Sequence, residues 1–239
     1  MAASVLAGAV AAVSGFGIGS LLTPVLVLLL GMPAASAVAV LAVPHALATG
    51  IRFVRLRRDV HVPTFREFGL ASAIGGLAGA ALQSQLTSPA LTIVLSALLV
   101  LAGTTELLRR RVPLPQTRPW RLAGGVLSGG FGGLVGNQGG IRAAALLGFQ
   151  LRPRQLVATA TASALLVDAA RVPIYFLSAG PVIARSIPLL LLIATGVTVG
   201  TFLGVPILGR IPESVYRRLV GVLLVVLGIG LFVLSRGSQ

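Results

Sequence analysis

The sequence predicts an all-α integral membrane protein made of two homologous helical repeats. Of its 239 residues, 56% are hydrophobic and only 10% are charged, whereas soluble domains average about 25% charged residues. Apolar stretches of about 20 residues, the length of a membrane-spanning helix, recur along the whole chain. The second half also repeats the layout of the first. Together these observations exclude an ordinary soluble domain.

Eight apolar runs are visible, at residues 4–30, 34–51, 67–86, 89–108, 122–149, 155–170, 186–208 and 215–235. Glycine-rich sequence interrupts the first run with "SGFGIGS" and the fifth with "GNQGG". Each arm beside these interruptions has about 10 residues, which as a helix crosses roughly half a bilayer. We therefore predict broken or re-entrant helices at 4–30 and 122–149.

The basic segment "LRRRVPLPQTRPWR" divides the chain. We expect a first repeat at 1–108, a basic linker at 109–121 and a second repeat at 122–239. The prolines of this basic segment suit a surface linker, and its single tryptophan suits an anchor at the membrane interface.

The two halves align without large gaps. An offset of 119 residues places Gly17 on Gly136 and Arg52 on Arg171. The matching order, spacing and interruptions favour an internal duplication. Inverted repeats gather more arginines on one side of the membrane than parallel repeats do, so the positive-inside rule favours inversion.

The formal net charge of +14 comes from arginines that lie mostly in loops between apolar runs. Such arginines set membrane topology and attract anionic lipid. The lipid bilayer of the inner membrane is therefore the expected environment, and nucleic acid is not an expected partner. The chain has no cysteine, and His45 and His61 are too far apart for a metal motif, so no metal or other cofactor is expected.

The interrupted runs carry the candidate binding residues. Backbone groups exposed by a broken helix must face protein, water or a ligand, and a helix start offers free N–H groups and a positive dipole end. The amides and the guanidinium of the second interruption add donors for an oxyanion. The candidate substrate-binding residues are Gly17, Gly19, Ser20, Gly136, Asn137, Gln138, Gly139, Gly140 and Arg142.

Three further residues are candidates for coupling or gating. Asp168 lies three residues before Arg171, so the two side chains are expected to pair on one helical face. Such a pair is equally consistent with a structural salt bridge and with a coupling site. His45 could relay protons, although a lone buried histidine is more often a packing residue. Arg52, inside a basic cluster, is expected to extend to a membrane interface.

Longer segments resemble the TauE/SafE family of sulfite and organosulfonate exporters. The resemblance lies in "GFGIGSLLTPVLVLLLGMPAASAVAV" and in "GNQGGIRAAALLGFQLRPRQLVATATAS", and it extends to "GGLAGAAL" and "RIPESVYRRLVGVLLVVLG". It implies a permease for a small sulfur-containing anion such as sulfite or an organosulfonate.

We expect a non-enzymatic transporter in which the two breaks meet and one repeat moves against the other. An anion channel and a membrane subunit of a larger complex are the alternatives, and a homo-oligomer stays open. An intramembrane enzyme is less favoured because no nucleophile and base lie at helical spacing.

Overall fold

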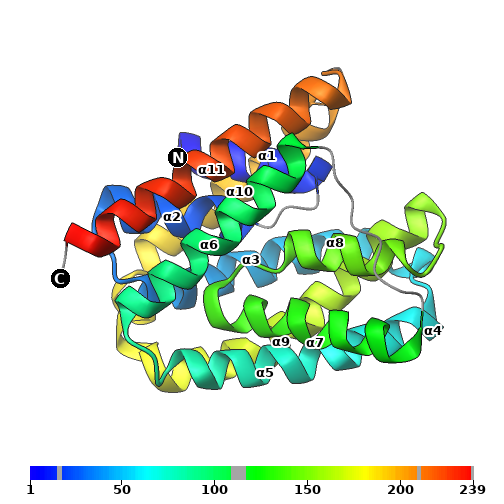
Figure 1. Ribbon diagram of the computed structural model, residues 1–239, viewed down its shortest axis with the longest axis horizontal. Coiled ribbons are helices and arrows are strands. Elements are labelled where there is room, and N and C mark those ends of the chain that lie inside the picture. The colour runs from blue at the N-terminus through cyan, green and yellow to red at the C-terminus, as the bar shows by residue number, and fades with distance from the viewer. Residues whose placement is uncertain (15–17, 109–116, 209–210, 238–239) are drawn as a thin grey trace.

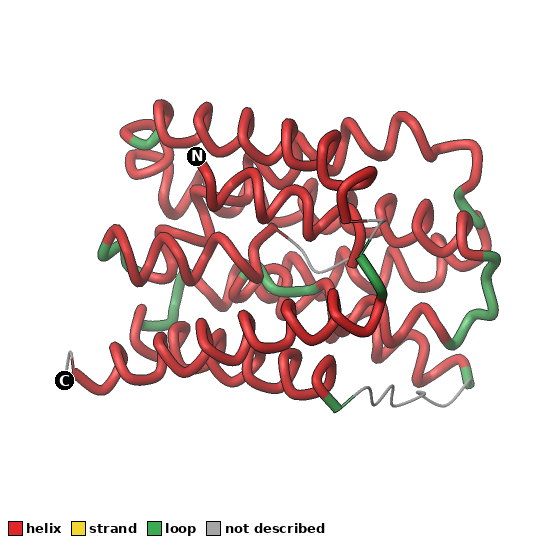
Figure 2. The backbone as a smooth tube through the Cα atoms, turned by 90° about the horizontal axis from the view of Figure 1, so that it is seen from above, coloured by secondary structure: helices red, strands yellow, loops and turns green. Residues whose placement is uncertain are grey.

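In the computed structural model, residues 1–14, 18–108, 117–208 and 211–237 are described, and every regular element within these ranges is a helix (Figures 1 and 2). Four of the described helices are long and apolar enough to cross a membrane: α3 (Ala34–Leu56), α6 (Ser88–Leu107), α9 (Pro153–Arg185) and α11 (Glu213–Gly237). The predicted all-α membrane class is confirmed.

Each interrupted run contains two helices. α1 (Ala2–Ser14) and α2 (Ile18–Leu30) form the first run, and α7 (Arg118–Val135) and α8 (Gly139–Leu147) form the fifth. The other elements are α5 (Leu70–Gln83), α10 (Ile187–Leu208), the short η1 (Arg57–Asp59) and α4 (Val62–Thr64), and the π-helical turn η2 (Phe65–Gly69).

Two helices differ in length from the runs that predicted them. α7 begins at Arg118, inside the predicted linker, because proline fits the first turn of a helix. α9 continues to Arg185, well past the expected end at residue 170. Its added part buries Tyr175 and Ile183 in a cluster with α3, and the helix bends at Ala179, two residues before a proline.

The buried apolar side chains fall into one large cluster and two smaller ones. The large cluster joins α1, α2, α3, α6, α10 and α11, while the second lies mainly between α3 and α9. Figure 1 shows α5 along one edge of the bundle and α11 along the opposite edge, with α3 between them. Helix α3 therefore occupies the centre and contacts both clusters.

Helices α5 and α7 pack backbone against backbone. A Cβ atom added at Gly75 would overlap the carbonyl oxygen of Val126, and one added at Gly129 would overlap that of Ser72. Gly75 and Gly129 therefore serve the packing of the two helices. Residue numbers rise together along the two helices, so they run parallel.

Helices α1 and α10 pack in the same way, but here the half-helix α1 comes from the first half of the chain and its neighbour α10 from the second. A Cβ atom at Gly200 would overlap the Val5 carbonyl oxygen, and one at Gly8 would overlap that of Val197. Thus the first helix of each half packs along a later helix of the other half. The crossing seams are made of glycine and carbonyl groups, which allow close approach of membrane helices.

Helices α6 and α11 contact each other in a reciprocal way. A Cβ atom at Gly103 would lie 2.6 Å from the carbonyl oxygen of Gly221, and one at Gly228 would lie 3.0 Å from that of Ser96. The Ser96 hydroxyl donates to the Gly228 carbonyl oxygen at 2.7 Å. Because residue numbers fall along one helix as they rise along the other, the two helices are antiparallel.

Neighbouring glycines of α7 give a matched test of the glycine seam. We expect Gly129→Ala to lower the melting temperature of the purified protein, because its methyl group would overlap the backbone of α5. Gly130→Ala meets only the Gly75 carbonyl oxygen, at 3.8 Å. It should be neutral or stabilising, since alanine exceeds glycine in helix propensity by about 1 kcal/mol. Equal melting temperatures for the two variants would contradict this packing.

Candidate functional site

One left-handed glycine fixes the break between α7 and α8. Gly136 follows α7 with a φ of +71°, a conformation that favours glycine. Its N–H donates to the Gly132 carbonyl oxygen at 3.1 Å, which closes the helix end. α8 then begins at Gly139 without a side-chain cap, so its first N–H groups lack partners within the helix. These groups are the positive end of the helix dipole.

The candidate residues of the second half surround this break: Gly136, Asn137, Gln138, Gly139, Gly140 and Arg142. Only 5% of Asn137, 2% of Gln138 and 8% of Arg142 is exposed. A run of amides and a guanidinium is therefore buried inside an apolar bundle, where each polar group needs a partner.

The break of the first half contacts the break of the second. The Ser20 hydroxyl, in the first turn of α2, donates to Asn137 Oδ1 at 2.8 Å. A Cβ atom at Gly19 would overlap the carbonyl oxygen of Gly136. Segments about 120 residues apart in the sequence thus meet inside the bundle. The candidate Gly17 lies outside the described residues.

Several buried polar atoms at this junction have no hydrogen-bond partner within the described part of the chain. They are Thr23 Oγ1, both amide atoms of Gln138 and Nη1 of Arg142. A Cβ atom at Gly136 would lie 3.7 Å from the Thr23 hydroxyl, which places that hydroxyl beside the break. Unsatisfied buried groups are costly and rare. All four atoms belong to residues at or beside the break between α7 and α8.

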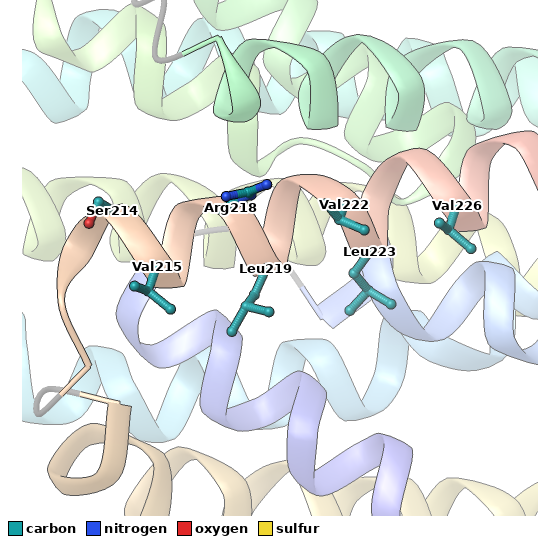
Figure 3. A pocket seen from close by; sticks show the side chains of 7 residues that line it. All are labelled: Ser214, Val215, Arg218, Leu219, Val222, Leu223 and Val226. Carbon is teal, nitrogen blue, oxygen red and sulfur yellow. The ribbon is translucent and has the colours of Figure 1, made fainter.

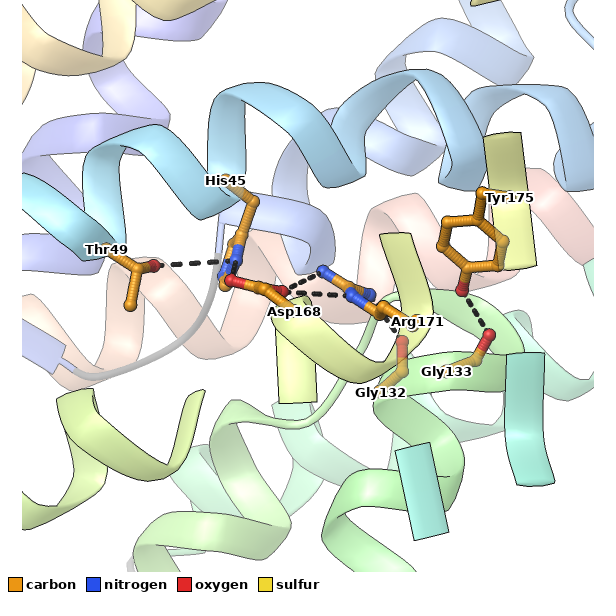
Figure 4. A network of polar contacts seen from close by, with 7 residues as sticks. All are labelled: His45, Thr49, Gly132, Gly133, Asp168, Arg171 and Tyr175. Atoms are coloured by element: carbon orange, nitrogen blue, oxygen red, sulfur yellow. Dashed lines mark hydrogen bonds and ion pairs between the residues drawn. The ribbon is translucent and has the colours of Figure 1, made fainter. Parts of the chain in front are cut away.

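A second polar network links α3, α9 and α7 (Figure 4). Nδ1 of His45 lies 2.7 Å from Asp168 Oδ2. Because an ionised carboxylate only accepts hydrogen bonds, the imidazole donates here. Asp168 Oδ1 accepts from Arg171 Nε at 3.0 Å and Nη2 at 2.8 Å, so the predicted ion pair is present. Nη1 of Arg171 donates to the carbonyl oxygen of Gly132, in the last turn of α7.

Arg52 and Arg171 make equivalent contacts in the two halves. Nη1 of Arg52 donates at 3.4 Å to the carbonyl oxygen of Ala11, near the end of α1. Each arginine thus binds the half-helix that precedes the break of its own half. The half-buried guanidinium of Arg52 thus contacts a neighbouring half-helix, and its position at a membrane interface stays a prediction.

Positive charge is in excess around the junction. Arg142 is within electrostatic range of Asp168, Arg52 and Arg171. The one carboxylate among these groups, that of Asp168, already pairs with Arg171. An isolated buried charge is unfavourable unless it is paired. The arrangement is suited to an anion.

The other hydroxyl groups near the site divide into two kinds. Those of Thr161 and Ser163 donate to the carbonyl oxygens four residues earlier, as hydroxyls in membrane helices commonly do. Thr49 Oγ1 lies 3.5 Å from His45 Nδ1, and Thr159 Oγ1 accepts from the His61 N–H. Only Thr23 is left with an unused hydroxyl among these residues.

Two open pockets lie elsewhere on the described chain, one on α11 and one beside α5 and α7 that is lined in part by Arg66, Glu67, Arg118 and Arg121. No cluster of three or more metal-ligating residues occurs in the described ranges. An open groove on the outside of α11 is lined mostly by Val215, Leu219, Val222, Leu223 and Val226, with Ser214 and Arg218 at one end (Figure 3). In a membrane protein such an apolar outer face contacts lipid.

Sequence reasoning missed two elements of the site. The Tyr175 hydroxyl donates to the Gly133 carbonyl oxygen and so fixes α9 to the end of α7. Its position four residues after Arg171, on the same helical face, is a signal that was present. The pairing of His45 with Asp168 joins residues 123 apart. Only the rule that an acid inside a span needs a partner could have indicated it.

Broken helices that meet inside a bundle, with buried polar groups at their ends, define the class of membrane transporters that hold their substrate between half-helices. The family model for the sulfite exporter TauE/SafE matches residues 1–231. The chain belongs to this family of membrane transporters, which is not a family of enzymes. Searches of curated proteins and of solved structures gave no match.

Proposed function

We propose that this protein transports a small sulfur-containing oxyanion, such as sulfite or an organosulfonate, and binds it where the two breaks meet. The observation that carries this proposal is the group of unpartnered buried polar atoms of Thr23, Gln138 and Arg142, three residues at or beside the break between α7 and α8. The family to which the chain belongs supports the chemical class of the substrate.

The proposed ligand would supply acceptors for the donors among these atoms. An oxyanion oxygen can accept from Arg142 Nη1, and a second can accept from the Gln138 amide nitrogen and the Thr23 hydroxyl. The third can accept from the free N–H groups at the start of α8. Gly139 and Gly140 leave these N–H groups uncovered, because glycine has no Cβ to hold the ligand away.

Ser20 and Asn137 have a different part in the proposed site. Their side chains already bind each other, so they hold the two breaks together and define the width of the site. Gly19 contributes by allowing its backbone to approach the Gly136 carbonyl group. Gly17 is proposed to belong to the same site by its alignment with Gly136.

We infer that the two halves are inverted repeats, with 1–108 and 122–239 joined by a linker at 109–121. Contacts between the halves support this. The antiparallel pair α6 and α11 makes the same glycine contact in both directions, and the Arg52 and Arg171 contacts correspond. A two-fold axis that makes equivalent helices antiparallel lies across the helix direction, as in inverted repeats. Transport would then proceed by movement of one repeat against the other.

Thermal unfolding with sulfite tests the proposed site. Sulfite should raise the melting temperature in a saturable way, because a ligand at 100 times its Kd adds about 2.7 kcal/mol to the stability. Gln138→Met keeps the side-chain length but removes the amide, so we expect at least tenfold weaker sulfite binding. Ser72→Ala is the matched control, since Ser72 Oγ is also buried without a partner but lies on α5.

Three outcomes of this experiment are informative. Weaker binding for Gln138→Met and normal binding for Ser72→Ala would support the site. Equal binding for both variants would contradict it. If sulfite, methanesulfonate and sulfate all leave the melting temperature of the native protein unchanged, the proposed substrate class is wrong. Accumulation against a gradient in proteoliposomes would separate a coupled transporter from a channel.

A further inference from the structure

The two halves of the chain differ in the residue that precedes the equivalent arginines, Arg52 and Arg171, by three positions. Arg52 and Arg171 both bind the end of the half-helix before a break. Three residues before each arginine stand Thr49 in the first half and Asp168 in the second. Only the second arginine is therefore held by a carboxylate. This carboxylate is itself held by His45, which comes from the first half.

His45 and Asp168 form the titratable pair next to Arg171, which binds the end of α7. The charged groups that interact with Asp168 are Arg171 on α9 and Arg142 on α8, Arg52 on α3 interacts in turn with Arg142, and Tyr175 follows on α9. Helices α2, α5 and α10, which pack against α3 or α9, contain no titratable residue. The side chain of His45 keeps 8% of its surface accessible, while that of Asp168 has none. The imidazole is therefore the more accessible member of the pair.

We propose that His45, bound to Asp168, is a proton-binding site coupled to the anion site. This inference rests on the proposed function. Neutral His45 donates its Nδ1 hydrogen to Asp168 and leaves Nε2 free to accept a proton from water. The imidazolium then competes with Arg171 for the carboxylate. Ionisable residues buried in membrane spans commonly form proton relays.

Arg171 connects the proposed proton-binding site to the break between α7 and α8. Arg171 joins Asp168 on one side and the Gly132 carbonyl oxygen on the other, and the Gly136 N–H donates to the same carbonyl. A change in the ion pair between Asp168 and Arg171 can therefore shift the turn at Gly136, which is part of the proposed anion site. An added positive charge also favours an anion nearby. By reciprocity, anion binding must then favour protonation of His45 by the same factor.

Two variants separate coupling from a structural role. We would measure sulfite affinity from pH 6 to pH 8 for the native protein, for His45→Gln and for His61→Gln. The titration of sulfite itself is the same in all three samples, so any difference between them belongs to the protein. Sulfite affinity should change with pH in the same way in the native protein and in His61→Gln. In His45→Gln this change should be smaller, by up to a factor of ten for each pH unit.

A spectroscopic measurement on the native sequence covers the case in which His45→Gln fails to fold. The chain has two histidines, so 15N-histidine NMR in lipid nanodiscs, assigned with His61→Gln, follows His45 directly. Saturating sulfite should increase the protonated fraction of His45 at a fixed pH and leave His61 unchanged.

The outcomes distinguish the coupling from the proposed function. If His45 keeps one protonation state from pH 5 to pH 9, or titrates identically with and without bound sulfite, the coupling is wrong although the anion site stands. If His45→Gln and the native protein share one pH dependence of affinity, the coupling is also wrong. A native protein that binds no sulfite at any pH contradicts the proposed function itself.

Discussion

Arg142→Met is expected to reduce anion flux by about 10- to 100-fold and to leave the protein at least as stable as the native form. Hydrogen bonds to charged groups contribute about 1.5–3 kcal/mol, and each 1.4 kcal/mol is a factor of ten in affinity. In the absence of substrate, however, Nη1 of Arg142 is buried without a partner. Removing it therefore relieves a cost in the empty protein.

This combination of effects distinguishes a binding residue from a packing residue. Sulfite flux into proteoliposomes and the melting temperature would be measured on the same preparations. Arg218→Met is the control, because Arg218 is an exposed arginine on the outer groove of α11 and the variant removes the same charge. A loss of stability together with unchanged flux would show that Arg142 serves the fold alone.

Asp168→Asn is expected to destabilise the bundle by about 3–5 kcal/mol, because breaking a buried ion pair leaves an uncompensated charge. Asp168 accepts from His45 and from two nitrogens of Arg171, and none of its side chain is exposed. An asparagine offers one oxygen where the carboxylate offers two. Either His45 or Arg171 would then face the amide nitrogen in place of an acceptor.

A double variant gives the matched control for this prediction. Asp168→Asn with Arg171→Met removes both charges, so it should recover a large part of the stability that the single variant loses. Chemical unfolding in detergent would measure the native protein, the two single variants and the double variant. Additive losses in the double variant would contradict a direct interaction between the two side chains.

Local features of the fold were predictable from sequence because they depend on near neighbours. The break at 136–140 follows from glycines and amides that a lipid-facing helix excludes, and Gly136 adopts the left-handed conformation there. The spacing of Asp168 and Arg171 predicts their pairing in the same way, since residues three apart share a helical face.

Contacts between distant segments were not predictable in this way. Nothing in the sequence near Ser20 indicates that its hydroxyl binds Asn137, or that Arg171 reaches the Gly132 carbonyl group. Helix seams posed the same difficulty. With 30 glycines in the chain, many helix pairs could pack closely, and only the three-dimensional arrangement selects α5 with α7 and α1 with α10. Packing of small residues lacks the specificity that charge or shape gives to a pair.

The glycine seams also determine which parts of the molecule can deform. Where backbone meets backbone, as between Gly129 and Ser72, there is no side chain that could change rotamer to absorb a displacement. Each of the two pairs, α5 with α7 and α1 with α10, should therefore move as one rigid unit. Each unit consists of the half-helix before one break and a helix from the opposite half of the chain. Because each unit combines helices from both repeats, any movement of one repeat against the other must take place in the helices outside these two pairs.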